Sequence, residues 1–123
     1  MSVSFGKSYH LCSKTVIDEV FKKGDTLKKY PFVIKVLEYK LPTNNSFQFL
    51  VSVPKRIHSS AVKRNRIKRQ VREVIRKRSV QIEQTLKQND HQLAIFIIYT
   101  SKDFHTYDFL DRKMDQLLTK LLK

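Results

Sequence analysis

Hydrophobic residues recur along the chain at two spacings, one typical of helices and the other of strands. Residues 13–23 carry apolar side chains at helical intervals, on the stripe Val16, Ile17, Val20 and Phe21. Lys22 and Lys23 close this segment and Gly24 follows it, a common way for a helix to end. The pattern predicts a first helix that stops at Gly24.

Two segments further along alternate between faces with the period of a strand. In residues 30–39 one face carries Phe32, Ile34 and Val36, and the other carries Val33, Lys35, Leu37 and Tyr39. In residues 47–53 aromatic and β-branched residues alternate with Gln48 and Ser52, and Pro54 should end the strand because it has no amide hydrogen. The turn sequence LPTNNS lies between the segments, so we expect them to pair as an antiparallel hairpin.

The second half of the chain predicts a long helix, a buried strand and a last helix. The long helix starts near Ser60, with Ser59 or Ser60 as its cap, and runs to Arg78, with a continuation to Lys87 open. Residues 93–99 (LAIFIIY) are apolar without alternation, which suits a central strand buried on both faces. An amphipathic stripe marks the last helix: Leu110, Met114, Leu117, Leu118, Leu121 and Leu122. The order of elements suggests a small α/β sandwich, one sheet with helices packed against it.

Composition adds a strong positive charge to this picture. A chain of 123 residues suits one domain over residues 1–123, and an apolar fraction of 41% excludes a wholly disordered basic protein. The formal net charge is +14, and eleven of the 25 Lys and Arg residues lie between Lys55 and Arg78, where Glu73 stands as the single acid. Such a charge favours RNA, DNA or an anionic membrane as partner and does not separate them.

The same long helix has two distinct sides. At about 100° per residue its apolar positions cluster on one side, as Ile67, Val71, Val74 and Ile75, which we expect to dock on the sheet. A broader neighbouring arc holds Arg64, Asn65, Lys68, Arg69, Arg72 and Arg76. Arg64, Lys68 and Arg72 form a row with a spacing of about 6 Å per turn, near that of phosphates along a strand. A simple solvated face would carry acids among its bases, so the pattern favours a shaped polyanion, with nucleic acid as the leading candidate.

Other kinds of site receive little support from the sequence. A single cysteine, Cys12, excludes an internal disulfide and suits a reducing compartment, and the start of the chain lacks the apolar core of a signal peptide. With no apolar run of membrane-spanning length, we expect a cytoplasmic protein. The four histidines show no metal-ligand spacing and are expected on the surface or in loops. We find no catalytic constellation, and we expect the strand aromatics to be core residues, with a minority free to stack on bases.

The ordered motifs around the long helix resemble the signature of one known family. They are SVPKR at residues 52–56, AV at 61–62, RNRIKR at 64–69 and RE at 72–73, and together they resemble the protein subunit of bacterial ribonuclease P. The resemblance extends outward over VFKKG at residues 20–24 and FV at residues 32–33. It implies an α+β fold of the ribosomal-protein-like type, a two-layer sandwich in the order αβββαβα. It also implies a third short strand and a left-handed βαβ crossover, against the usual right-handed rule.

The resemblance also implies partners and roles for particular residues. The partners would be the catalytic RNA, bound at one protein per RNA, and precursor tRNA, whose 5′ leader the enzyme removes. The catalytic RNA would meet the basic surface at Lys55, Arg56, Arg64, Asn65, Arg66, Lys68, Arg69 and Arg72. A cleft for the single-stranded leader would include Phe21, with Ile17 and Lys35 at positions where the family often has Phe and Tyr. The RNA would perform the hydrolysis with Mg²⁺ that it binds itself, and the protein alone would bind no cofactor.

Two alternatives remain open from the residues alone. A structural RNA-binding protein of the ribosomal type would share the charge and most of the architecture, and would lack only this order of motifs. A basic amphipathic helix lying on an anionic membrane is a second alternative. Such a helix usually exposes Trp, Phe or Leu, whereas the apolar side here is the Val and Ile that a core needs.

Overall fold

The computed structural model describes residues 9–11, 13–42 and 44–122, and three helices and four strands form in them. They follow in the order α1 (Lys14–Lys23), β1 (Asp25–Lys29), β2 (Phe32–Glu38), β3 (Phe47–Ser52), α2 (Ala61–Gln88), β4 (Leu93–Tyr99) and α3 (Tyr107–Leu121). The order αβββαβα and the α+β class agree with the expectation. The short strand β1 reads DTLKK, which has too few apolar residues to be found by alternation, and it was expected from the family resemblance alone.

The strands form one sheet in the order β1-β2-β4-β3, so the predicted hairpin between β2 and β3 is wrong. The strand β4 lies between them, antiparallel to β2 and parallel to β3. Its apolar residues on both faces suit this central place. Two residues of the turn sequence that suggested a hairpin, Leu41 and Asn45, are instead held by Gln92, which lies directly before β4. The Leu41 amide donates to Gln92 Oε1 (3.1 Å), and the Gln92 side chain donates to the Asn45 carbonyl (2.9 Å).

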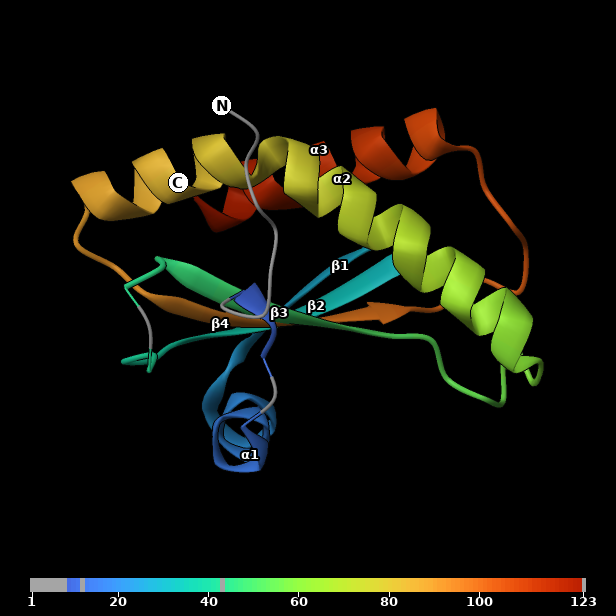
Figure 1. The fold of residues 1–123 in the computed structure, drawn as a ribbon, viewed down its shortest axis with the longest axis horizontal. Helices are drawn as coiled ribbons and strands as arrows, with labels where there is room; N and C mark the ends of the chain where they lie inside the picture. The colour runs from blue at the N-terminus through green and yellow to red at the C-terminus, as the bar shows by residue number, and fades with distance from the viewer. Residues whose placement is uncertain (1–8, 12, 43, 123) are drawn as a thin grey trace.

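The helix α2 connects the parallel strands β3 and β4 across one face of the sheet. In Figure 1 these strands run from left to right with α2 above the sheet, and β4 lies behind β3, so the crossover is left-handed. Figure 1 also shows α2 and α3 together over this face, with α1 alone on the opposite face. The sheet therefore separates two apolar layers of unequal size.

The larger layer lies between the sheet and the pair of helices α2 and α3. Alternate residues of β2 point into it, and so do the four apolar residues of α2 that were expected to dock: Phe32, Ile34, Val36, Ile67, Val71, Val74 and Ile75. The predicted stripe of α3 is buried in the same layer at Leu110, Met114, Leu117 and Leu118. The smaller layer lies beneath α1 and contains Leu11, Val16, Val20, Leu41, Ala94 and Phe96.

The helix ends follow local chemistry that the sequence shows. The Ser60 hydroxyl accepts a hydrogen bond from the Lys63 amide and caps α2, whose 28 residues run past Arg78 and include the continuation to Lys87 that the sequence left open. Gly24 ends α1 at an ordinary φ of −73°, so its importance is spatial. A Cβ there would overlap the Val20 carbonyl oxygen and lie 2.8 Å from the Val36 carbonyl oxygen. Glycine therefore lets the end of α1 lie directly against β2.

Candidate nucleic-acid interface

The solvent side of α2 carries the basic surface predicted from the sequence. A hollow of about 480 Å³ lies on this side of the helix, and it is lined by Asn65, Lys68, Arg69, Arg72, Glu73 and Arg76. Within the described residues the side chains of Lys68, Arg69 and Arg72 form no ion pair and no hydrogen bond. Because α2 docks through its opposite side, these three cations are held on a rigid element with their charge available to a partner.

Glu73 limits the charge of this hollow at one end. Its carboxylate accepts two hydrogen bonds from Arg76, at 2.9 Å from Nε and 2.5 Å from Nη2, in the parallel geometry typical of arginine–carboxylate pairs. The hydrogen bond from Arg76 lowers the pKa of the Glu73 carboxyl. Arg76 was placed on the basic arc by its helical position, but this ion pair distinguishes it from Lys68, Arg69 and Arg72.

Arg64 and Arg66 are also engaged within the protein. Arg64 Nη1 donates to the carbonyls of His58 (3.1 Å) and Ser59 (2.8 Å), and thereby ties the loop before α2 to its first turn. The guanidinium of Arg66 lies over the Phe104 ring, 5.1 Å from its centroid. In the predicted row of Arg64, Lys68 and Arg72, Arg64 therefore stabilises the loop before α2, whereas Lys68 and Arg72 are free to bind a partner.

The loop before α2 presents Lys55 and Arg56 to solvent. The amides of Ile57 and His58 both donate to the Pro54 carbonyl (3.1 Å each), which folds the loop into a compact turn. His58 lies in this loop, in line with the expectation of a surface or loop histidine, but its side chain is buried and its Nε2 lies 3.0 Å from the Ser101 carbonyl. This contact ties the loop to Ser101, just beyond the end of β4.

The three predicted cleft residues lie on the opposite face of the sheet, Ile17 and Phe21 on α1 and Lys35 on β2. The Phe21 side chain is 46% exposed and meets Phe96 of β4 edge to face at 4.8 Å. Lys35 Nζ lies 5.7 Å from the centroid of the Phe21 ring and donates to Thr26 Oγ1 (3.1 Å). Ile17 packs partly buried against the layer beneath α1. An exposed ring and a cation thus stand beside one another over an apolar floor.

Phe96 and Thr26 complete this site and were not identified from the sequence. The strand register places Lys35 opposite Thr26 on β1 and opposite Phe96 on β4, so all three share one face. Phe96 lies in a run that is apolar throughout, where alternation gives no sign of which side chain faces α1. Its aromatic ring is the one local signal that could have suggested a stacking role.

The described residues, with positions 1–8, 12, 43 and 123 left aside, contain no group of three or more His, Cys, Asp or Glu side chains arranged to hold a metal ion. Over the same residues no helix is long and apolar enough to cross a membrane. What the arrangement offers chemically is binding by charge and by stacking, on two opposite faces of the sheet.

Comparison with known proteins agrees with the motifs around α2. The family model described as ribonuclease P matches residues 5–122. A protein of Porphyromonas gingivalis named ribonuclease P protein component is 30% identical over 118 residues, covering 94% of this chain and 84% of that protein. A protein of the same name from Lactobacillus helveticus is 36% identical over 77 residues, covering 63% of this chain and 62% of that protein's own length.

Solved structures share the fold. The ribonuclease P protein of Staphylococcus aureus, as a mutant with defective mRNA degradation activity, superposes with a TM-score of 0.75 at 24% identity, over 94% of this chain and 89% of that one. The ribonuclease P protein of Thermotoga maritima gives a TM-score of 0.73 at 21% identity, over 90% and 96%. With the family model matching nearly the whole chain, this protein belongs to the ribonuclease P protein component family.

Proposed function

We propose that this chain is the RNA-binding protein subunit of a ribonuclease P ribonucleoprotein, with one protein bound to each catalytic RNA. The observation that carries the proposal is the set of unpaired cations Lys68, Arg69 and Arg72, held on a rigid helix within the motif shared with the family. Lys55 and Arg56 extend the same charge into the loop before α2. Cations in these positions relieve the repulsion between RNA phosphates, each neutralised phosphate releasing counterions.

We infer a second role for the surface around Phe21, as the cleft that binds the single-stranded 5′ leader of precursor tRNA. A base can stack on the exposed ring of Phe21, and Lys35 beside it can pair with the adjoining phosphate. Ile17 and Lys35 replace the aromatic residues common in the family, so stacking here depends on Phe21 and Phe96. The cleft and the basic surface lie on opposite faces of the sheet, so one molecule can contact the leader and the catalytic RNA together.

In this proposal the bond is broken by the RNA. Mg²⁺ bound mainly by the RNA subunit would support hydrolysis, and the protein would position the substrate and lower the requirement for Mg²⁺ by supplying positive charge of its own. The product would be tRNA with a mature 5′ end.

Reconstitution tests this proposal. Mixed with a bacterial ribonuclease P RNA, the protein should allow removal of the leader at a lower Mg²⁺ concentration than the RNA alone requires. Purified protein free of nucleic acid should leave precursor tRNA intact. If the protein failed to stimulate the RNA at every Mg²⁺ concentration, the proposal would be contradicted. If the protein co-purified with ribosomal RNA and not with a ribonuclease P RNA, a ribosomal role would be indicated.

The leader cleft has a separate test in Phe21→Ala. Loss of one stacked base should weaken binding of leader-bearing precursor tRNA by about fivefold or more, since stacking on an aromatic side chain contributes about 1–3 kcal/mol per base. Affinity for tRNA without a leader and for the catalytic RNA should stay unchanged. Val80→Ala, which removes an exposed apolar side chain from the far part of α2, serves as the matched control. Equal affinity of Phe21→Ala and wild type for the leader-bearing substrate would refute the assignment.

A further inference from the structure

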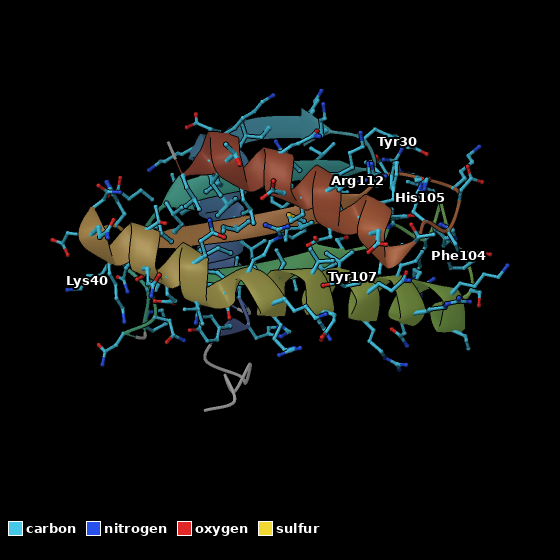
Figure 2. The ribbon with its side chains drawn as sticks, turned by 90° about the horizontal axis from the view of Figure 1, so that it is seen from above. Tyr30, Lys40, Phe104, His105, Tyr107 and Arg112 are labelled. Carbon is cyan, nitrogen blue, oxygen red and sulfur yellow. The ribbon has the colours of Figure 1, made fainter. Side chains whose placement is uncertain are left out.

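Aromatic side chains gather at a second place, at the end of the sheet where α2 begins. Tyr30 lies in the turn between β1 and β2 and is 55% exposed, and Phe104 lies in the loop between β4 and α3 and is 41% exposed. Figure 2 shows both of them, with His105, at the same end of the molecule. Exposed apolar side chains that lie singly are common on protein surfaces, whereas exposed rings that gather at one place mark an interaction surface. We call this region the Tyr30–Phe104 surface.

Hydrogen bonds and ring contacts hold these side chains in fixed positions. The Tyr30 hydroxyl and Ser101 Oγ lie 2.6 Å apart, and Ser101 Oγ lies 2.9 Å from His105 Nε2. The rings of Tyr30 and His105 meet edge to face at 5.7 Å. Buried His58 supports Phe104 from below, with 5.6 Å between ring centroids. Because these contacts already order the rings, stacking of a ligand on them would cost the protein little conformational entropy.

Cations accompany the rings. Arg66 lies over Phe104, as described above, and Lys113 Nζ lies over Phe109, 5.4 Å from its centroid. Phe109 in turn stacks on His105 at 4.4 Å. Aromatic platforms interleaved with arginine and lysine are the arrangement that binds single-stranded nucleic acid, where bases stack and cations meet the phosphates.

We propose that the Tyr30–Phe104 surface is a second binding site for unpaired bases of single-stranded RNA, separate from the cleft at Phe21. Charge complementarity selects this occupant, because Arg66, the cation over Phe104, lies on α2 together with the basic surface. Arg66 is the link, since it belongs to the RNRIKR segment of α2 and also lies over Phe104. An RNA that follows α2 can therefore place an unpaired stretch on these rings. The inference rests on the proposed role in RNA binding.

The test compares two probes, an oligoadenylate of about 12 nucleotides and an abasic ribose–phosphate oligomer of the same length. The double variant Tyr30→Leu/Phe104→Leu keeps apolar bulk and removes both rings. It should bind oligoadenylate at least about fivefold more weakly, as expected for the loss of one stacked base, and bind the abasic oligomer as the wild type does. The same loss should appear when Phe21→Ala has already removed the cleft. Tyr30→Phe, which keeps the ring and removes the hydroxyl, should retain binding.

Nuclear magnetic resonance of the unmodified protein provides a test that does not depend on how well a variant folds. With phenylalanine rings labelled with carbon-13, oligoadenylate should shift the Phe104 signals and the abasic oligomer should leave them in place. Phe104 signals that stay unchanged at saturating oligoadenylate would overturn the inference, as would equal losses of affinity for both probes in the double variant. If the wild type bound neither probe, the proposed RNA-binding function itself would fail. Normal binding of the abasic oligomer with no response at Phe104 would refute the second site alone.

Discussion

Glu73 is the acid that lines the hollow beside Lys68, Arg69 and Arg72, and its removal should strengthen RNA binding. The carboxylate holds Arg76 through two hydrogen bonds, beside the free side chains of Lys68, Arg69 and Arg72. Glu73→Gln removes the negative charge while keeping the length of the side chain. Arg76 then becomes available to a phosphate, and the hollow gains one positive charge without any change in the docked side of the helix.

The expected size follows from counterion release. One additional neutralised phosphate makes the slope of log K against log salt concentration steeper by about 0.9, the value for a nucleic-acid duplex of the B form. At ~1 M salt the added charge is screened, so the variant and the wild type should bind the RNA with similar affinity. Over the tenfold fall to ~0.1 M salt, the steeper slope makes the complex of the variant about eightfold tighter than that of the wild type. Folding should change little, because both side chains are about two-fifths exposed and exposed ion pairs contribute weakly to stability.

The assay is titration of the catalytic RNA with the protein at several salt concentrations, with the wild type alongside. The matched control is Glu73→Gln/Arg76→Gln, which has the same net charge as the wild type and should keep the wild-type slope. A slope for Glu73→Gln that equals that of the wild type would show that RNA does not reach this part of α2. A slope that became shallower would contradict the electrostatic reasoning as a whole.

Two further predictions concern the fold that holds these surfaces. Gly24→Ala should lower the free energy of unfolding by about 1–3 kcal/mol in urea denaturation, because the new Cβ would meet the carbonyls of Val20 and Val36, both on backbone that cannot yield locally. Lys23→Ala is its control, and unchanged stability of Gly24→Ala would show that α1 can shift freely. Burial raises the pKa of Tyr99 to about 12 from the ordinary value of about 10. The unfolded chain therefore loses this proton first, so the free energy of unfolding should fall by about 2 kcal/mol as pH rises from about 10 to about 12. Tyr99→Phe should remove this part of the fall, and a pH dependence identical to that of the wild type would refute it.

The sequence pattern determined the three helices, the three longer strands and the place of the charge. Helical spacing of apolar residues depends on local geometry, so it located α1, α2 and α3, and alternation gave the two faces of β2. The uniform apolar character of β4 also identified it as the central strand, since burial on both faces leaves no polar side. The density of cations on α2 could be counted directly, because it requires no knowledge of distant residues.

The tertiary structure decided which elements and which charges meet. The alternation of side chains along a strand shows which face is buried but does not show which strand lies beside it. For this reason the sequence could not reveal that β4 lies between β2 and β3, where a hairpin was expected. In the same way, helical position put Arg64, Arg72 and Arg76 on one arc without distinguishing them. Arg72 is the one with no ion pair or hydrogen bond within the described residues, since Arg64 is held by loop carbonyls and Arg76 by Glu73. Pairings of this kind depend on the distances between side chains, which the folded backbone sets.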